Sequence, residues 1–138
     1  MFTGEHERLL DEKGRLVLPP LFRRHLQDTV FLARSTSDSC LMIFPPEEIQ
    51  EVADRLKERV RTGEVSQNEQ RRWSASITEV RADTQGRVAI PPKLRDQVGL
   101  DREVIVIGVV DRAEVWDVRA WAAVESSTDE GISEGLWL

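Results

Sequence analysis

Short stretches of alternating apolar and polar residues occur in two parts of the chain, and most of them end at a turn or a pair of prolines. This pattern is typical of half-buried β-strands. It predicts eight strands, over residues 6–10, 15–18, 29–34, 40–44, 77–82, 87–90, 103–110 and 113–117. All six prolines lie in three Pro-Pro pairs that each separate a predicted strand from a predicted helix, since proline ends a ladder and fits the first turn of a helix.

Apolar residues three or four positions apart, together with helix start and stop signals, predict five helices. These cover residues 20–26, 47–61, 66–73, 92–98 and 118–125. The second has an apolar stripe along one side, which predicts an amphipathic helix. The third begins with Ser66-Gln67-Asn68-Glu69, the pattern of a capping box.

One segment of the sequence occurs twice. Residues 11–23 read DEKGRLVLPPLFR, and residues 83–95 read DTQGRVAIPPKLR, 72 positions later. A repeat of this length, held in register, indicates a tandem duplication. The chain is therefore expected to have four parts: a first half (1–46), a helical insert (47–76), a second half (77–125) and an acidic tail (126–138).

The repeated Asp-x-x-Gly suits a tight turn, because Asp accepts local backbone hydrogen bonds and Gly adopts a left-handed conformation without strain. Asp11 and Gly14 stand between the first two predicted strands, and Asp83 and Gly86 between their counterparts. Each copy is therefore predicted to cap a β-hairpin.

Composition indicates a globular protein. The 138 residues are 40% hydrophobic and 32% charged, with a net charge of −6. A single cysteine, Cys40, forms no intrachain disulfide and no metal cluster, and is expected to be a small apolar residue at a strand edge. The N-terminus lacks the features of a secretory signal, and no apolar run approaches the ~18 residues of a membrane span, so a cytoplasmic protein is expected.

The acidic charge is unevenly distributed. Residues 99–138 hold three basic and nine acidic side chains, whereas residues 1–98 hold sixteen of each. The net charge alone argues against a protein coated with basic residues for nucleic acid. Since the acidity belongs to the distal part of the chain, that objection does not apply to the two repeated turns.

No catalytic constellation is found. Residues 131–135, GISEG, match the serine-hydrolase pattern G-x-S-x-G, but that pattern needs a later histidine, and both His6 and His25 lie far upstream. We therefore expect no enzyme activity, no cofactor, no metal and no small-molecule substrate.

Arg15 and Arg87 each follow a turn glycine, beside Lys13 in the first copy and Gln85 in the second. A guanidinium is a planar fork of donors that suits phosphate or the O6 and N7 atoms of guanine, and a two-stranded ribbon can enter a major groove. Equally, each arginine can pair with the aspartate of its own turn. On the residues alone both interpretations stay open, and they are compatible.

Arg23 and Arg95 also repeat, one helix downstream. Their simplest interpretation is a salt bridge that fastens helix to hairpin, so together with Asp11 and Asp83 they are structural candidates.

The chain resembles the MraZ family of bacterial transcriptional regulators, built from two AbrB-type (SpoVT-AbrB) halves. The resemblance spans about residues 1–125. A single D-x-x-G-R is a weak signal, whereas two copies around a helical insert are specific. The matching segments are MFTG (1–4), DEKGRL (11–16), PPLFR (19–23), CLMIFP (40–45), DTQGRVAIP (83–91) and EVWD (114–117).

This resemblance implies an α+β fold in which two swapped-hairpin halves form one pseudo-twofold β-barrel, with the helical insert and further helices at its periphery. It also implies a ring-shaped homo-oligomer that binds double-stranded DNA at direct repeats in the promoter of the division and cell-wall gene cluster. The expected role is a repressor, cytoplasmic and associated with the nucleoid, with no membrane partner.

Carried over by position, Arg15 and Arg87 are the expected DNA contacts, with Lys13 assisting in the first turn. The turn glycines Gly14 and Gly86 are expected to belong to the same DNA-binding site. Gln85 replaces that lysine in the second turn, which puts its phosphate contacts in doubt. Two alternatives remain open: an oligomeric scaffold without specific DNA binding, and an AbrB-like antitoxin. Antitoxins of that type usually carry one half and a toxin-binding tail.

Overall fold

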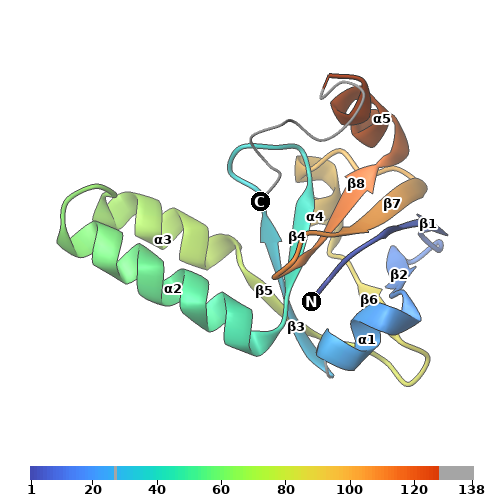
Figure 1. The fold of residues 1–138 in the computed structure, drawn as a ribbon, viewed down its shortest axis with the longest axis horizontal. Coiled ribbons are helices and arrows are strands. Elements are labelled where there is room, and N and C mark those ends of the chain that lie inside the picture. Colours follow the sequence, from blue (N-terminus) through green and yellow to red (C-terminus); the bar gives the residue numbers. More distant parts are fainter. Residues whose placement is uncertain (27, 128–138) are drawn as a thin grey trace, which may run out of the picture.

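The computed structural model describes residues 1–26 and 28–127 (Figure 1). Every predicted strand and helix is present, with ends that differ by at most three residues. The elements are β1 (Glu5–Leu9), β2 (Arg15–Val17), α1 (Pro20–Leu26), β3 (Thr29–Arg34), β4 (Leu41–Phe44), α2 (Pro46–Arg61), α3 (Gln67–Ser76), β5 (Thr78–Arg81), β6 (Arg87–Ala89), α4 (Pro92–Gln97), β7 (Glu103–Gly108), β8 (Ala113–Asp117) and α5 (Val118–Ser127).

Six strands form one antiparallel sheet in the order β1-β7-β8-β4-β3-β5, and β2 pairs with β6 in a separate two-stranded ribbon. The duplication relates β1 to β5, β2 to β6, β3 to β7 and β4 to β8. If each strand is replaced by its counterpart in the other repeat, the same six-strand order is obtained, read from the opposite edge of the sheet. The fold is therefore pseudo-twofold, as expected from the repeat.

The pseudo-twofold axis can be placed from the strand register. Met42 pairs with Glu114 between β4 and β8, and Leu16 pairs with Val88 between β2 and β6. Both pairs join positions that are 72 residues apart, so each is a residue facing its own repeat counterpart. The axis passes through the middle of the ribbon and the middle of the sheet.

Two expectations about the sheet need correction. The six-stranded sheet is open, with β1 and β5 at its edges, so it is not the closed barrel that the resemblance implied. The strands flanking each turn also do not form a hairpin: β1 pairs with β7 and β5 with β3, while β2 and β6 pair with each other. The halves exchange strands because each three-residue strand finds its partner in the other repeat.

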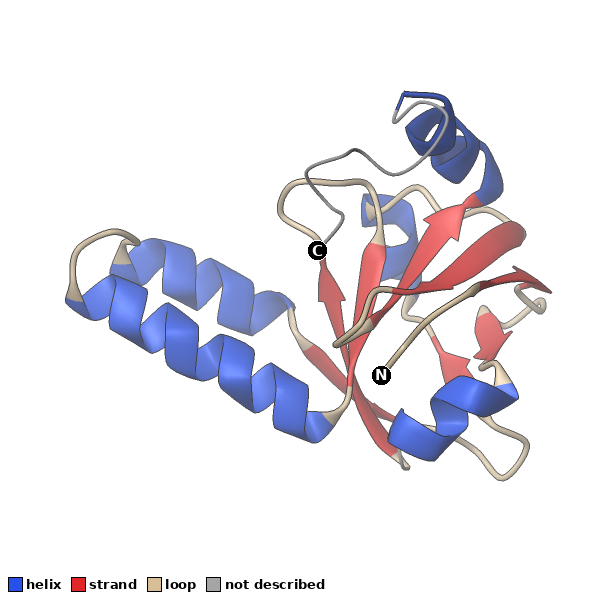
Figure 2. Cartoon of the chain, viewed as in Figure 1, coloured by secondary structure: helices blue, strands red, loops and turns tan. Residues whose placement is uncertain are grey.

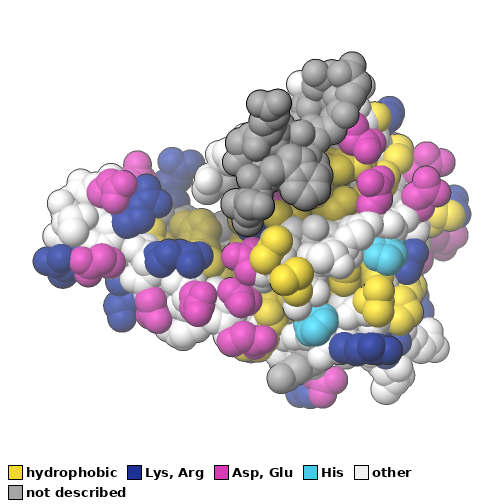
Figure 3. Space-filling view, viewed as in Figure 1, with side chains coloured by type: hydrophobic (Ala, Val, Ile, Leu, Met, Phe, Trp, Pro, Cys, Tyr) yellow, Lys and Arg dark blue, Asp and Glu magenta, His cyan; other side chains and the backbone are white. Residues whose placement is uncertain are grey.

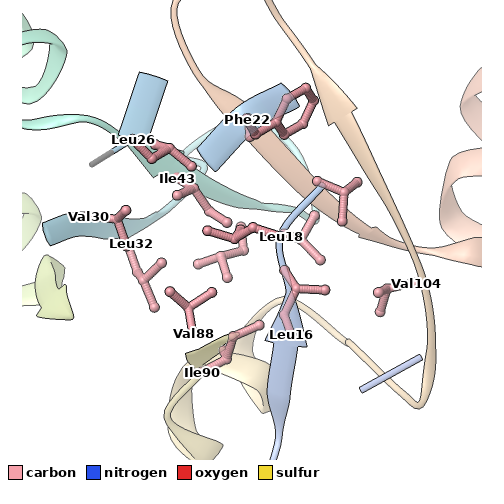
Figure 4. Close-up of a cluster of buried hydrophobic side chains, with 14 of the residues drawn as sticks. Leu16, Leu18, Phe22, Leu26, Val30, Leu32, Ile43, Val88, Ile90 and Val104 are labelled. Carbon is pink, nitrogen blue, oxygen red and sulfur yellow. The ribbon is translucent and has the colours of Figure 1, made fainter. Parts of the chain in front are cut away.

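The core lies between the sheet, the ribbon and helices α1 and α4 (Figure 4). Burial of each large apolar side chain contributes about 1.5–3 kcal/mol. Residues of both repeats interdigitate, so neither half has a core of its own. The labelled members are Leu16, Leu18, Phe22, Leu26, Val30, Leu32, Ile43, Val88, Ile90 and Val104.

A smaller apolar cluster contains Cys40, Ile105, Ile107 and Trp116, with Trp121 of α5 packed against it. Cys40 is fully buried and lies next to the start of β4, as predicted. Helix α5 ends at Ser127, so it includes the first two residues of the predicted acidic tail. Residues 128–138, including the G-x-S-x-G match, lie outside the described residues.

Helices α2 and α3 form an antiparallel pair that extends away from the strands (Figure 2). The predicted capping box is present, since Ser66 Oγ accepts from the Glu69 N–H at 3.0 Å and Glu69 Oε2 accepts from the Ser66 N–H at 3.0 Å. No helix in the described part of the chain is long and apolar enough to cross a membrane.

Candidate nucleic-acid interface

The first turn, residues 11–15, is held by Asp11. One carboxylate oxygen, Oδ1, accepts the backbone N–H groups of Lys13 and Arg15, both at 2.9 Å. The other, Oδ2, accepts Arg15 Nε at 2.6 Å. The turn closes on the backbone as well, where the Gly14 N–H donates to the Asp11 carbonyl at 2.9 Å. One aspartate therefore fixes both the backbone of the turn and the orientation of its arginine.

The second turn, residues 83–87, repeats this arrangement. Asp83 Oδ1 accepts the N–H groups of Gln85 and Arg87 at 2.9 Å, and Oδ2 accepts Arg87 Nε at 2.7 Å. The aspartate pairing weighed in the sequence analysis is thus present in both turns. Of the arginine side chain, the aspartate accepts from Nε only. Within the described residues the terminal nitrogens of Arg15 and Arg87 make no hydrogen bond, so they can donate to a ligand.

The same contacts shift the ionisation of the two aspartates. The backbone N–H of Arg15 lowers the pKa of Asp11, and its guanidinium and the Lys13 N–H act in the same direction. The pKa of Asp83 is lowered in the same way by the Arg87 N–H and guanidinium and the Gln85 N–H. Both carboxylates stay charged at neutral pH, so both ion pairs persist.

The turn glycines join the two halves. Gly14 and Gly86 have φ of +73° and +77°, a region that favours glycine. The Gly14 carbonyl accepts the Ile90 N–H, and the Gly86 carbonyl accepts the Leu18 N–H, both at 3.0 Å. Each turn therefore hydrogen-bonds to the strand that leaves the other turn.

Arg23 and Arg95 do not form the predicted salt bridges within the described residues. Arg95 lies across the first turn, where a Cβ on Gly14 would stand 2.5 Å from its Cζ, and Arg23 lies in the same way against Gly86. Arg95 Nε also donates to the Ile90 carbonyl at 3.1 Å. The strand exchange brings the arginine of one half to the turn of the other, and the spacing in the sequence cannot show this.

The ribbon places Arg15 and Arg87 on one surface. Side chains alternate along a strand, so Leu16 and Val88 point into the core while their neighbours point outward. Arg15 stands opposite Ala89, and Arg87 stands opposite Val17. The two arginines are thus diagonal to each other on the outer face of the ribbon, at positions related by the pseudo-twofold axis.

Other basic groups lie beside this surface. Lys13 is exposed in the first turn, and Gln85 is exposed in the second. Arg8, on β1, donates from Nε to the Val17 carbonyl at 3.2 Å. Sequence reasoning missed Arg8 because its repeat counterpart is Val80, so no repeated pattern marks it.

The remaining candidates for chemistry differ in burial: Cys40 is buried, His6 is half-buried and His25 is exposed. Desolvation, with Glu114 nearby, raises the pKa of the Cys40 thiol to about 12. His6 packs edge-on against Phe22 at 5.3 Å between ring centroids, and His25 packs against Phe2 at 5.5 Å. Among the described residues, no group of three or more His, Cys, Asp or Glu side chains is arranged to hold a metal ion.

A groove of about 1120 Å³ lies between the α2–α3 pair and the sheet. Apolar side chains line it, and basic ones that form no ion pair within the described residues stand among them. Over the helical pair, Figure 3 shows basic and acidic side chains mixed on the outer surface. The apolar set includes Met42, Phe44, Val52, Leu56, Trp73 and Leu94, and the cations without an ion pair to a described residue are Arg34, Arg55, Arg72 and Lys93. The ion-paired Arg59 and Arg112 and the acidic Glu69 and Asp111 also line the groove.

Comparison with known proteins finds one family model that matches residues 1–72 and 75–135, described as "MraZ protein, putative antitoxin-like". Proteins called "Transcriptional regulator MraZ" are similar over nearly the whole chain. That of Salinispora arenicola is 41% identical, covering 99% of this chain and 100% of its own length. That of Kineococcus radiotolerans is 41% identical, covering 94% of this chain and 88% of its own length. That of Cutibacterium acnes is 36% identical, covering 97% of this chain and 94% of its own length.

Proposed function

This chain belongs to the MraZ family, and on that premise we propose that it is a sequence-specific DNA-binding transcriptional regulator. Its targets are direct repeats in the promoter of the division and cell-wall gene cluster, where it acts as a repressor in the cytoplasm, at the nucleoid. The observation that carries the proposal is the placement of two aspartate-held arginines on one outward face of a two-stranded ribbon.

The ribbon suits a major groove, which admits a two-stranded β-ribbon and distinguishes all four base pairs. Arg15 and Arg87 are each held through Nε, so their terminal nitrogens have little freedom left to lose on binding. A guanidinium donates two parallel hydrogen bonds to O6 and N7 of guanine, and each such contact contributes roughly 1–3 kcal/mol of discrimination.

Phosphate contacts come from the cations around the ribbon. Lys13 is exposed in the first turn, and Arg23 and Arg95 lie against the two turn glycines. Contacts of this kind position a protein on the duplex without reading its sequence. Because they displace counterions from the DNA, the affinity of this protein should fall steeply as salt rises.

Assembly of several copies supplies the remaining affinity. The groove beside the α2–α3 pair, with its apolar lining and its cations that form no ion pair within the described part of the chain, is the surface that a second copy of the chain would cover. Copies of this chain that contact one another head to tail form a ring when the rotation between neighbouring copies closes. Linked sites raise avidity by about 10²–10⁴ when their spacing matches the DNA repeats.

The groove also favours a second candidate, a protein-binding module without specific DNA binding, such as a scaffold or an antitoxin. An apolar lining with unpaired cations is a surface that a protein partner can cover. Salt dependence separates the candidates, since only the regulator has a DNA affinity that falls with salt.

The proposal is tested with DNA from upstream of the gene itself, with its repeats intact or scrambled, in electrophoretic binding assays. We expect tight binding only to the intact repeats, and a smaller preference for them in Arg15→Ala, which keeps the guanine contact of Arg87. The matched control is Arg71→Ala, which changes an exposed arginine of α3. This variant should bind both DNAs like wild type. Equal affinity for intact and scrambled DNA, or wild-type specificity in Arg15→Ala, would overturn the proposal.

A further inference from the structure

The outer face of the ribbon carries two apolar side chains as well as two arginines. Val17 is 44% exposed, and Ala89, diagonal to it across the ribbon, is exposed as well. Neither is needed for the core, because Leu16 and Val88 of the same strands fill it with no exposed surface. Phosphate contacts alone do not account for these two side chains, because apolar groups do not bind charged oxygens.

The strand register sets the distance between the two kinds of side chain. Val17 stands directly opposite Arg87, and Ala89 directly opposite Arg15. Facing residues of an antiparallel pair have Cα atoms about 4.5–5.5 Å apart. Val17 and Arg15 are two residues apart on one strand, or roughly 6.6 Å. Stacked base pairs are about 3.4 Å apart. An apolar group on this face therefore meets the DNA within about two base pairs of each arginine.

One base-edge feature of the major groove is apolar, the C5 methyl group of thymine. We propose that Val17 reads the methyl group of a thymine lying within two base pairs of the guanine that Arg87 contacts. Ala89 holds the equivalent place beside Arg15, but its side chain has two fewer carbon atoms than that of Val17. This inference rests on the proposed function, and it adds thymine to the bases that the ribbon recognises.

The test removes the methyl group from the DNA and leaves the protein intact. Each thymine of the repeat is replaced in turn by deoxyuridine, and affinity is measured by fluorescence anisotropy. Burial of one methyl group corresponds to about a fourfold change in affinity. We expect a loss of this size at one thymine of each repeat, and wild-type affinity at the others.

The protein is then changed to match. Val17→Ala should bind thymine and deoxyuridine repeats equally, at the lower of the two affinities. Val110→Ala, the same substitution at an exposed valine outside the ribbon, should keep the full sensitivity to deoxyuridine. Specific binding with no sensitivity at any thymine overturns this inference and leaves the proposed function standing, as does sensitivity that survives in Val17→Ala. Absence of specific binding to the intact repeats overturns both.

Discussion

The two turns of this protein have the same backbone and different surfaces. Asp, Gly and Arg recur in both, and each is held by the same hydrogen bonds to within 0.1 Å. The positions that do not shape the turn have diverged: Lys13 corresponds to Gln85, and Val17 to Ala89. Residues that build the geometry are thus kept in both repeats, while residues that only face outward differ between them.

The first turn has one more cation than the second, although Glu12 in place of Thr84 leaves both turns with no net charge. It has Lys13 at its tip, and Arg8 reaches the ribbon at Val17. The repeat counterpart of Arg8 is Val80, which packs against the core. We therefore expect both turns to read bases, and the first to supply more of the phosphate contacts.

Removal of both arginines is the strongest test of two equivalent readers. Arg15→Ala and Arg87→Ala should each weaken specific binding by about 5- to 150-fold, the loss of one guanine contact. The double variant should fall to non-specific affinity, a loss of roughly 10³-fold or more. Anisotropy titrations on intact and scrambled repeats measure this. A double variant no weaker than Arg15→Ala would show that the second turn does not read DNA.

Alanine at each turn glycine tests the link between the halves. Gly14→Ala and Gly86→Ala should each lower the free energy of unfolding by about 1 kcal/mol, the cost of a left-handed alanine. The new Cβ also displaces the guanidinium of Arg95 or Arg23. This group is the flexible end of its side chain, so it can move away while the turn stays folded. Its proposed phosphate contact is then lost, and DNA binding should weaken several-fold.

Gly63→Ala is the matched control for both substitutions. Gly63 has φ of +82° and no heavy atom within 4 Å of an added Cβ. It should lose the same stability in thermal unfolding and bind DNA as well as wild type. If it weakens DNA binding as much as Gly14→Ala does, the turn arginines are not the cause.

Exchange of the divergent charges has a smaller expected effect. Lys13→Gln should lower the slope of log affinity against log salt by about 1, and Gln85→Lys should raise it by about 1. Base preference should stay the same in both variants. Salt titrations of the two proteins check this, and a changed base preference would place Lys13 among the reading residues.

Acid should affect the two turns equally, and only at low pH. The pKa of Asp11 and that of Asp83 are both lowered by folding. Their contribution to stability is therefore complete above the ordinary aspartate range near 4 and is lost as pH falls through the lowered pKa. Carboxyl chemical shifts measured by NMR should show both groups titrating together below that range. An ordinary pKa at one of them would mean that its turn is not formed in solution.

The secondary structure was predictable because its signals are local. Proline pairs mark the starts of α1, α2 and α4, and the Ser66 capping box marks the start of α3. Several strands were predicted one or two residues too long, among them the strand over 103–110. In the structure this strand, β7, ends at Gly108, where the backbone of Thr3 leaves no space for a side chain. That contact joins residues more than 100 positions apart, and no local pattern reports it.

The site was predictable in its residues and less so in its construction. The repeat identified Arg15 and Arg87 and the aspartates that hold them. The hairpin interpretation was wrong because strand alternation shows which face is buried and not which strand is the partner. The exchange of strands also sets the positions of Arg23 and Arg95. The salt bridges predicted for these two arginines were therefore wrong for the same reason. Arg8 contacts the ribbon through a single side chain with no repeated signal.

The central claim is that both turns read bases from one face, and 7-deazaguanine tests it most directly because it removes only the N7 acceptor. Each guanine of the repeat is replaced in turn, and affinity is measured for wild type, Arg15→Ala and Arg87→Ala. We predict losses of at least about fivefold at two guanines for wild type. Arg15→Ala should be insensitive at one of them and Arg87→Ala at the other. The same sensitivity profile in all three proteins would contradict the claim.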